Sequence, residues 1–434
     1  MKTIVVAGLG YVGLTTAACL AQLDNRVIGF DIDREKVATL RSGQMTFSEP
    51  GLPELVVNNM RAGRLTFTAD VRQAMASADM AFICVGTPSD EAGRADLTQV
   101  ESTTAAIARN SRRSFITVLK STTPTGTADL VAAILAENPP LGVHSSVVVN
   151  PEFLREGTAV RDFFQPDRVV VGSWDARAAE EVAALYSSIR CPVVITDPPS
   201  AQLIKYASNA FLATKISFIN EIALVADSVG ASVKVVAEGM GFDERIGPQF
   251  LEAGLGYGGS CFPKDVLALS KLAEDCAAPS ALLHAVMDIN ARQRRMAVNK
   301  LSRALGDNLM GREVCVMGLA FKADTDDVRE SPALEVISAL CASGTVVRAY
   351  DPVAASVASR AAPPHRWLRY FDDAYEAAYG SNAIFIATDW AQIRALDWRR
   401  IYSTMLGRTI VDGRGLLGPE EMRAIGYDYV SVTG

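Results

Sequence analysis

The segment GLGYGGSCFPKD, residues 254–265, combines residue types that could carry covalent and acid–base chemistry. Cys261 follows four glycines and stands shortly before Pro263, Lys264 and Asp265. Pro263 suits the first turn of a helix, so we expect Cys261 at a helix N-terminus. A helix N-terminus and a nearby lysine favour the reactive thiolate of a cysteine. The sequence therefore predicts a nucleophile at Cys261, in a loop whose glycines let the backbone approach a ligand closely.

The remaining cysteines and the histidines predict neither a disulfide framework nor a metal site. The chain has seven cysteines and three histidines. An odd count without a CxxC pair argues against disulfides and structural zinc. The widely spaced histidines argue against a His-based metal site or a Ser-His-Asp triad. We therefore expect no metal and a reducing cytoplasm, with the cysteines of apolar runs as small buried hydrophobic residues: Cys19, Cys84 and Cys315.

Two residues with polar side chains stand four apart in a long apolar segment. From about Ala201 to Val229 apolar residues recur at helical spacing, which predicts one long helix, a spine between domains and a dimer surface. Lys205 and Asn209 share one face of this helix. Such a pair alone is more often a solvated surface than a site.

The N-terminal segment predicts a dinucleotide fold. The β-branched run TIVVA (3–7) precedes GLGYVG (8–13), an Ala-rich helix follows to about Leu23, and a second strand, RVIGF (26–30), ends at Asp31. The glycines allow a tight turn, close approach to a pyrophosphate and close helix packing, while the helix N-terminus attracts the phosphates. A carboxylate at Asp31 binds ribose hydroxyls and repels a 2′-phosphate, so NAD is favoured over NADP. The alternative is the same fold with an empty site.

Further strands are expected at 80–85, 114–119 and 146–149, each followed by polar or turn residues. Ligands bind beyond the carboxyl ends of strands in open α/β sheets, so the loops after these strands are candidate sites. The last loop contains Glu152 and Glu156. On their own, these acids are explained more simply as residues near a helix start that its dipole stabilises.

The length and the net charge of the chain limit the remaining classes of protein. A chain of 434 residues predicts two to four domains, and a net charge of -7 without a strong basic run gives nucleic-acid binding little support. The uncharged stretch from Thr3 to Leu23 resembles a signal peptide, but three glycines interrupt it and no A-x-A-like cleavage site follows. No other segment is expected to span a bilayer, so we predict a soluble protein without a membrane partner.

After Gly311 the pattern of the first half partly returns. Strands are expected at 313–317, 345–350, 383–387 and 409–411, with a helix at 331–342. The turn that begins at Gly318 lacks the three-glycine spacing, so its ligand should be a different nucleotide. We predict an α/β protein of two Rossmann-like doubly wound domains joined by a long central helix, with domains at 1–198, 199–308 and 309–434.

These motifs together resemble the UDP-sugar and GDP-sugar 6-dehydrogenases. The resemblance runs from the first strand to near the C-terminus and rests on GLGYVG, ICVGTP, KSTTPTGT, NPEFLREGTA, KYASNAF, GFDERIGPQFLEAGLGYGGSCFPKD, GLAFKADTDDVRESP and VDGRG. It is strongest to the branch that acts on UDP-glucose. It implies oxidation of UDP-glucose to UDP-glucuronate by two NAD, without release of the aldehyde, in a homodimer or larger homo-oligomer.

The resemblance also implies residue roles. Cys261 matches the nucleophile, Lys205 and Asn209 the residues that hold the C6 oxygen, Asp265 the partner of Lys205 in proton handling, and Thr122, Glu152 and Glu156 the water-organising and acid/base positions. NAD contacts fall on Gly8, Gly10, Tyr11, Val12, Gly13, Asp31, Lys36, Thr87, Thr122, Glu156, Lys264 and Arg329. UDP-glucose contacts fall on Glu152, Phe153, Leu154, Lys205, Asn209, Phe250, Tyr257, Gly258, Phe321, Lys322 and Arg414, with Arg245 matching an arginine that reaches the neighbouring subunit's sugar nucleotide.

Other functions stay open. Two features favour UDP-glucose over GDP-mannose as the substrate: the stretch that precedes Cys261, and the residue Phe262. The FPKD continuation favours UDP-glucose over N-acetylated UDP-hexosamines. A two-electron β-hydroxyacid dehydrogenase shares the NAD domain and the Lys…Asn pair but has no use for Cys261. A non-catalytic nucleotide-sugar sensor gains nothing from Lys205, Asn209, Cys261 and Asp265 together.

Overall fold

The computed structural model of the protein describes residues 1–137, 140 and 142–433. These residues form two compact units, Met1–Ser208 and Asn209–Gly434. The three-way division at 198 and 308 stays a prediction, and its last residue, 434, lies outside the described ranges.

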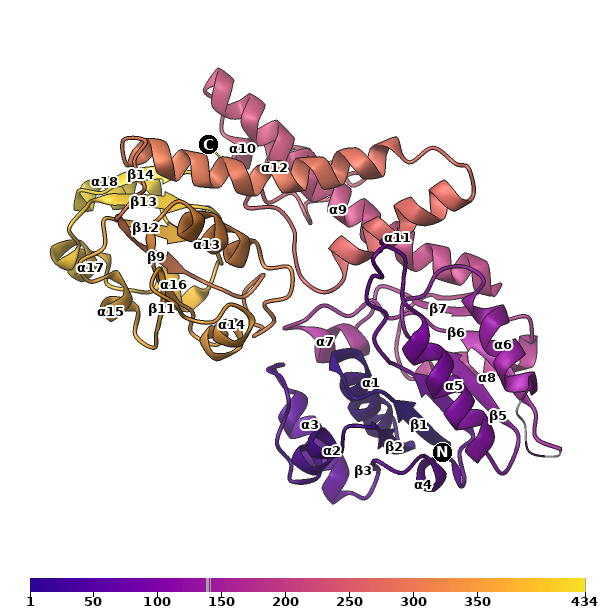
Figure 1. Ribbon diagram of the computed structural model, residues 1–434. Helices are drawn as coiled ribbons and strands as arrows, with labels where there is room; N and C mark the ends of the chain where they lie inside the picture. Colours follow the sequence, from indigo (N-terminus) through magenta and orange to yellow (C-terminus); the bar gives the residue numbers. More distant parts are fainter. Residues whose placement is uncertain (138–139, 141, 434) are drawn as a thin grey trace. The chain divides into compact units, whose positions relative to one another are not determined.

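The first unit is built on an eight-stranded sheet with helices on both faces (Figure 1). The strand order is β3-β2-β1-β4-β5-β6-β7-β8, and its first six strands have the doubly wound order 3-2-1-4-5-6. All neighbours are parallel except β6 and β7, which pair antiparallel. The strands are β1 (Thr3–Ala7), β2 (Arg26–Phe30), β3 (Leu65–Thr68), β4 (Met80–Ile83), β5 (Phe115–Leu119), β6 (Ser145–Val149), β7 (Val169–Gly172) and β8 (Val193–Thr196).

The two faces of this sheet form two separate cores. In β1, Ile4 and Val6 belong to one core, and Val5 and Ala7 to the other, because successive side chains point to opposite faces. Both faces are therefore buried, which explains the continuous apolar run at the N-terminus. The helices are α1 (Tyr11–Gln22), α2 (Arg34–Arg41), α3 (Leu52–Arg61), α4 (Val71–Met75), α5 (Thr98–Asn110), α6 (Thr127–Glu137), α7 (Ala159–Phe164), α8 (Ala176–Ala183) and the 3-10 turn η1 (Ala184–Tyr186).

Helix α9 (Pro198–Val229) is a single helix of 32 residues that crosses the boundary between the units. It is the one helix in the described ranges that is long and apolar enough to cross a membrane, and 44% of its most apolar window is buried. The sequence had not singled out this segment as a candidate span; length and composition alone make it one. Its buried residues include Gln202, Lys205, Asn209 and Asn220, each with a hydrogen-bond partner in the protein, so a core helix explains the segment.

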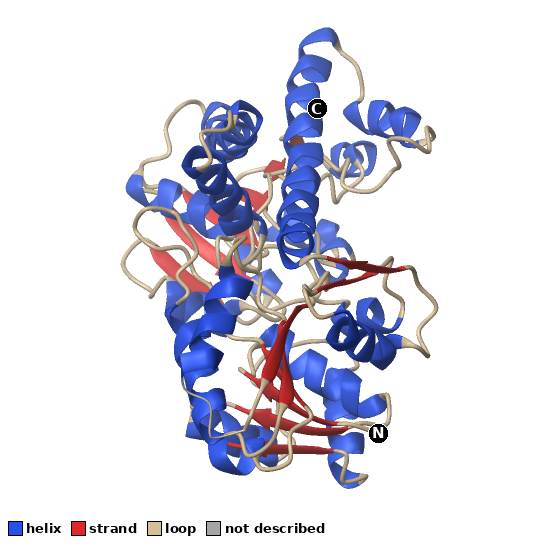
Figure 2. Cartoon of the chain, turned by 90° about the vertical axis from the view of Figure 1, so that its right-hand side faces the viewer, coloured by secondary structure: helices blue, strands red, loops and turns tan. Residues whose placement is uncertain are grey.

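The second unit combines helices with a six-stranded parallel sheet (Figure 2). The order β11-β10-β9-β12-β13-β14 again follows the pattern 3-2-1-4-5-6, so the sequence-based expectation of a second Rossmann-like fold is confirmed. The strands are β9 (Glu313–Met317), β10 (Val346–Tyr350), β11 (Leu368–Phe371), β12 (Ala383–Ile386), β13 (Thr409–Asp412) and β14 (Asp428–Ser431). The helices are α10 (Val233–Gly241), α11 (Phe262–Asp275), α12 (Ala281–Ala304), α13 (Pro332–Ala342), α14 (Ala355–Ala361), α15 (Ala374–Ala378), α16 (Ala391–Arg394), α17 (Trp398–Thr404) and α18 (Pro419–Ile425).

Candidate active site

The glycine turn between β1 and α1 has the geometry that a bound pyrophosphate needs. Gly8 has φ +91°, and a Cβ at Gly13 would collide with the Gly8 carbonyl. Nothing lies within 4 Å of a Cβ position at Gly10, so the turn is open there. Among the described residues, α1 has no side-chain cap at Gly10 and no acid in its first turn. Its first N–H groups and positive dipole end are therefore suited to a phosphate.

Asp31 lies at the carboxyl end of β2 and fastens this turn. Its Oδ2 accepts the Leu9 N–H at 2.8 Å and the Lys36 ammonium at 3.0 Å, and its Oδ1 accepts the Asp33 N–H at 3.0 Å. The carboxylate is buried beside the turn, where a ribose diol could reach it. These residues fit NAD. Tyr11 and Val12 open α1, and Lys36 lies in α2.

The loops after β4 and β5 are joined by hydroxyl contacts. The Thr87 hydroxyl donates to the Thr122 carbonyl at 2.8 Å, and the Ser121 hydroxyl donates to the Val85 carbonyl at 2.7 Å. Both threonines lie beyond the carboxyl ends of strands in the sheet that carries the glycine turn, as the sequence predicted.

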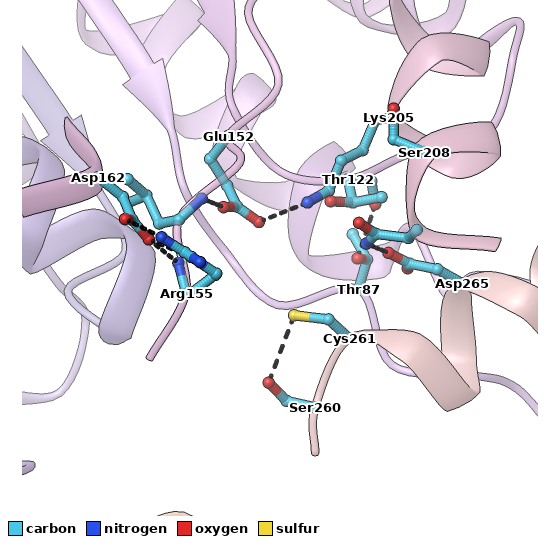
Figure 3. A network of polar contacts seen from close by, with 12 residues as sticks. Thr87, Thr122, Glu152, Arg155, Asp162, Lys205, Ser208, Ser260, Cys261 and Asp265 are labelled. Atoms are coloured by element: carbon cyan, nitrogen blue, oxygen red, sulfur yellow. Dashed lines mark hydrogen bonds and ion pairs between the residues drawn. The ribbon is translucent and has the colours of Figure 1, made fainter. Parts of the chain in front are cut away.

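Glu152 and Lys205 form a buried ion pair in the first unit. The Lys205 ammonium donates to Glu152 Oε1 at 3.0 Å, and each side chain is 4% exposed (Figure 3). The Leu154 N–H donates to Glu152 Oε2 at 2.5 Å. Burial alone raises the pKa of Glu152, but the Lys205 charge and these hydrogen bonds outweigh it and lower that pKa. Glu152 is thus held as a carboxylate next to a proton-bearing amine.

The residues that follow Glu152 are also fixed. The Arg168 guanidinium carbon lies 3.6 Å from the centroid of the Phe153 ring. The Lys205 ammonium nitrogen lies 5.3 Å from the same centroid. Arg155 forms a fork with Asp162, donating at 2.9 and 2.7 Å (Figure 3). Leu154 packs at the edge of the core, and Glu156 is buried. The simpler interpretation of Glu152 and Glu156, acids near a helix start, does not account for the buried ion pair of Glu152.

In the second unit, Asp265 joins Asn209 to Lys264. The Asn209 amide donates to Asp265 Oδ2 at 2.6 Å, and the Lys264 ammonium donates to Oδ1 at 2.5 Å. The Asp265 side chain is 1% exposed. Asn209 lies about one helical turn after Lys205 on α9, and each of these two side chains has a buried carboxylate as its partner.

Cys261 is the N-cap of α11, with Pro263 in the first turn, as predicted. Its sulfur lies 3.6 Å from the Ser260 hydroxyl (Figure 3). No disulfide forms among the seven cysteines, all of which lie in the described ranges. Burial raises the pKa of Cys84 and Cys315 to about 12, which keeps them as inert thiols, whereas Cys261 is only partly buried.

Three side chains of α12 clamp the glycine-rich loop before Cys261. Asn290 accepts the Tyr257 N–H at 2.8 Å and donates to the Tyr257 carbonyl at 3.0 Å, and Arg294 donates to the same carbonyl at 2.6 Å. Gln293 donates to the Gly254 carbonyl at 2.8 Å. Asn220 of α9 accepts the Gly254 N–H at 2.8 Å. Both backbone polar groups of Gly254 and of Tyr257 therefore have partners.

The glycines of this loop approach protein atoms rather than open space. A Cβ at Gly256 would collide with Asn290, one at Gly258 with the Glu330 carbonyl, and one at Gly259 would lie 2.7 Å from the Phe321 ring. Packing against α12 and the loop after β9 is thus a constraint on these glycines that the sequence did not indicate, and their close approach to a ligand stays a prediction. Phe250 precedes this loop in a left-handed conformation, φ 64°, near the Phe262 ring.

Arg414 lies at the carboxyl ends of three strands in the second sheet. It donates to the Ala387 carbonyl after β12 and to the Phe321 carbonyl after β9, at 2.9 and 3.0 Å. No carboxylate of the described residues lies within ion-pair distance of it, and burial lowers the pKa of its guanidinium. A half-buried cation whose side-chain hydrogen bonds go to carbonyls, with no carboxylate at ion-pair distance, suits an anionic ligand. Lys322 lies 5.6 Å from the centroid of the Phe321 ring.

Two arginines with predicted ligand contacts lie at the surface. Arg245 is 89% exposed and pairs with Asp243, and Arg329 is 62% exposed and pairs with Asp327. The two sheets also differ in the carboxylate that follows their second strand, Asp31 after β2 and Asp351 after β10. Asp351 accepts the Leu319 and Ala320 N–H groups and the Trp390 indole N–H, so this carboxylate is consumed inside the fold.

Sequence analysis missed several residues that hold the site. Asn290, Gln293, Arg294 and Asn220 are ordinary polar residues of helices, and no local pattern marks them. Lys120 and Asn150 open two of the loops that the sequence marked as candidate sites, although no sequence pattern assigned either residue a role of its own. The Lys120 ammonium donates to Asn150 Oδ1 at 3.1 Å, and burial lowers the pKa of Lys120 to about 8. Within the described ranges no group of three or more His, Cys, Asp or Glu side chains could hold a metal ion.

The chain matches three domains of one family along its length. Residues 2–190 match the NAD binding domain of the UDP-glucose/GDP-mannose dehydrogenase family, residues 199–292 its central domain and residues 315–419 its UDP binding domain.

Individual proteins are similar over their whole length. UDP-glucose 6-dehydrogenase TuaD of Bacillus subtilis is 43% identical over 432 residues, covering 100% of this chain and 93% of that protein. The structure of a UDP-glucose dehydrogenase from Pyrobaculum islandicum superposes with a TM-score of 0.93 at 41% identity, covering 100% of this chain and 98% of the other. A UDP-D-ManNAc dehydrogenase from Pyrococcus horikoshii gives 0.87 at 28% identity, covering 99% of each chain.

Proposed function

Because the chain belongs to the UDP-glucose/GDP-mannose dehydrogenase family, we propose that it oxidises UDP-glucose to UDP-glucuronate with two NAD per substrate. The observation that carries the four-electron reaction is Cys261, a partly buried thiol at the N-cap of α11, four residues before the buried Asp265. An alcohol dehydrogenase that stops at the aldehyde has no use for such a thiol.

Bound NAD supplies a two-electron hydride acceptor. Its sites on this chain are the glycine turn, Asp31 and the loops of Thr87 and Thr122. Lys36, Lys264, Glu156 and Arg329 complete the proposed cofactor contacts.

Cys261 links the two oxidations. Its thiolate adds to the C6 aldehyde, and protonation of the oxygen gives a thiohemiacetal. Oxidation of that carbon by two electrons gives a thioester, with loss of the hydroxyl proton to a base of the protein. Water then adds to the thioester, the C–S bond breaks, and the acid and the thiol are released. The aldehyde stays covalently held between the two oxidations.

The polar residues divide the proton transfers. Lys205 and Asn209 hold the C6 oxygen, where donors stabilise negative charge. Glu152 receives protons through Lys205 or a water, and its ion pair at 3.0 Å supports this role. Asp265, Glu156 and Thr122 orient the hydrolytic water.

The nucleotide sugar is assigned to the second sheet and to the loop that contains Cys261. Arg414, with no carboxylate partner among the described residues, takes the diphosphate, and Lys322 assists it. Phe153, Leu154, Phe250, Tyr257, Gly258 and Phe321 complete the proposed contacts. Arg245, exposed on the second unit, is proposed to reach the sugar nucleotide of a second copy.

A homodimer or larger assembly fits the apolar surface of α9. Phe211, Phe218 and Val225 are spaced by seven residues and are 65%, 44% and 55% exposed. This spacing keeps them on one stripe of the helix, which a second copy could cover. A cytoplasmic location keeps Cys261 reduced, as the mechanism requires.

The test is the number of NADH formed per nucleotide sugar. Incubation with limiting UDP-glucose should give two NADH and one UDP-glucuronate. One NADH with an aldehyde or alcohol-level product contradicts the thioester route, and no NADH with any nucleotide sugar favours a sensor. Parallel assays with GDP-mannose, UDP-galactose and UDP-N-acetylglucosamine decide the substrate.

A further inference from the structure

Glu49 is a buried carboxylate whose partners come from two functional segments of the first unit. It is 2% exposed and lies before α3. Its Oε2 accepts the Tyr11 hydroxyl at 2.6 Å and the Gly157 N–H at 2.6 Å, and its Oε1 accepts the Ala159 N–H at 2.7 Å. The two backbone contacts span more than 100 residues of sequence, so the fold must place them.

This carboxylate has no cation to balance it. In the described part of the chain no Lys, Arg or His nitrogen lies within ion-pair distance of Glu49. Burying a charge without hydrogen bonds is very costly, so the three short donors are what makes this position tolerable. A side chain needed only for packing could be apolar here.

The segments that Glu49 joins belong to the two ligands. Tyr11 is the first residue of α1, in the glycine turn. Gly157 and Ala159 directly follow the stretch that contains Glu152 and Glu156. The Tyr11 hydroxyl also lies 3.0 Å from the Arg155 carbonyl, within that same stretch. The cofactor turn and the acid-bearing loop thus share one anchor.

We propose that Glu49 is a positioning residue that fixes the loop of Glu152 and Glu156 to the dinucleotide turn through Tyr11. It touches neither ligand. It sets where the two acids lie when NAD occupies the turn, so occupation of the turn also orders the loop. The kinetic part of this inference rests on the proposed function. The link that Glu49 makes between the loop and the turn can be measured without turnover.

The first test uses amide hydrogen exchange on the full chain. In the wild type, NAD should slow exchange in the peptide that covers Gly157 and Ala159 at least threefold. Glu49→Gln keeps the volume but turns an NH₂ group toward backbone donors. In that variant, exchange of this peptide should be at least about tenfold faster, because a hydrogen bond to a charged group is lost, and NAD should no longer slow it. Unchanged exchange in both states overturns the proposal.

The second test separates positioning from stability. Glu49→Gln should lower kcat with UDP-glucose at least tenfold and raise KM for NAD by a smaller factor. The matched control is Asp79→Asn, because Asp79 also accepts a backbone N–H, from Thr3 at 2.7 Å, but lies at the amino ends of the strands. The control should lower the melting temperature and leave kcat within about twofold. Equal kcat losses in both variants would mean that Glu49 acts through stability alone.

Two further measurements keep the test decisive. If Glu49→Gln does not fold, Tyr11→Phe removes one of the three donors, and NAD should then protect the Gly157 peptide less than in the wild type; equal protection refutes the tie. If the wild type shows no turnover with UDP-glucose, the proposed substrate fails, but the exchange experiment with NAD still decides the role of Glu49.

Discussion

Lys205 Nζ lies 3.0 Å from Glu152 Oε1, and both side chains are 4% exposed. The two residues are 53 positions apart, one on α9 and the other in the loop after β6. Breaking a buried ion pair leaves an uncompensated charge, which typically costs about 3–5 kcal/mol. This pair therefore connects the stability of the first unit to the proposed proton transfers.

Glu152→Gln should lower the free energy of unfolding by about 3 kcal/mol at pH 7 and reduce kcat at least a hundredfold. The pKa of Glu152 is lowered from 4.5 in the fold, so its contribution is present above about pH 4.5 and is lost as pH falls through the lower folded value. Urea unfolding of both proteins from pH 3 to 7 measures this. A difference that stays constant across that range contradicts the assignment. Asp167→Asn, at an exposed carboxylate of the same unit, serves as the control.

Lys120 predicts a pH dependence of the same sign, in a higher pH range. Its pKa is lowered from 10.5 to about 8, first by burial, with Cys84, Glu152 and Lys205 as its charged or titratable neighbours. Below about pH 8 the folded and unfolded lysines are both charged, so the full penalty is present. Between about pH 8 and 10.5 the folded lysine loses its proton first, and the penalty is relieved.

The stability of the wild type relative to Lys120→Met should therefore rise by up to about 3 kcal/mol between pH 7 and 10. Denaturant unfolding of both proteins at each pH gives this difference, in which other titrating groups cancel. Lys271→Met, at a lysine paired with Glu274 on α11, should show no such rise. A flat difference for Lys120 would mean that its ammonium is better solvated than the fold suggests.

Cys261→Ser should bind NAD with unchanged affinity and form no net UDP-glucuronate, because a hydroxyl cannot easily replace the thiolate as nucleophile and leaving group. A covalent adduct trapped on the introduced serine can be sought by intact-protein mass spectrometry. Cys276→Ser, at the exposed C-terminal end of the same helix, is the matched control and should turn over normally. Normal acid formation by the Cys261 variant would remove the thioester route.

Arg414→Met should raise KM for UDP-glucose about 10- to 100-fold, since a hydrogen bond to a charged group contributes roughly 1.5–3 kcal/mol. KM for NAD should not change, because Arg414 belongs to the second sheet. Steady-state kinetics with each ligand varied separately measure the two constants. Arg408→Met, at an exposed arginine before β13, tests for a general loss of charge. Equal rises in both KM values would place the effect on folding instead.

The elements of the fold were largely predictable where the pattern is local. β1 and β9 were predicted with the bounds that the structure has, because a strand buried on both faces is a continuous apolar run. Five strands were not predicted. The edge strands β3, β8, β11 and β14 are four residues long and mix apolar with polar or exposed residues. The fifth, β7, is buried and apolar but is also only four residues long. The helical spacing of Lys205 and Asn209 was visible, but their partners were not.

The contacts that hold the site depend on the tertiary fold. Glu49 reaches Gly157 across 108 positions, and Asn290 reaches Tyr257 across 33. A single glutamate or asparagine on a polar helix or loop has the same local signature whether it is buried or solvated. Only the packing of the second unit makes Asn290 a clamp, and its helix, rich in Arg and Asn, has the composition of an exposed one.

Asn290→Ala should loosen the loop that carries Cys261. The change leaves the buried Tyr257 N–H without its acceptor, which costs roughly 1–3 kcal/mol, and opens space beside Gly256. Asn290→Asp should cost less in loop order, because it can still accept from Tyr257 but cannot donate to its carbonyl. We expect faster alkylation of Cys261 and a lower kcat in both variants, with the smaller change in Asn290→Asp and the larger in Asn290→Ala. Thiol labelling and turnover measure the two effects. Arg292→Ala, exposed on the same helix, should change neither. An equal labelling rate in all three variants would show that the other partners, Asn220, Gln293 and Arg294, are enough to hold the loop.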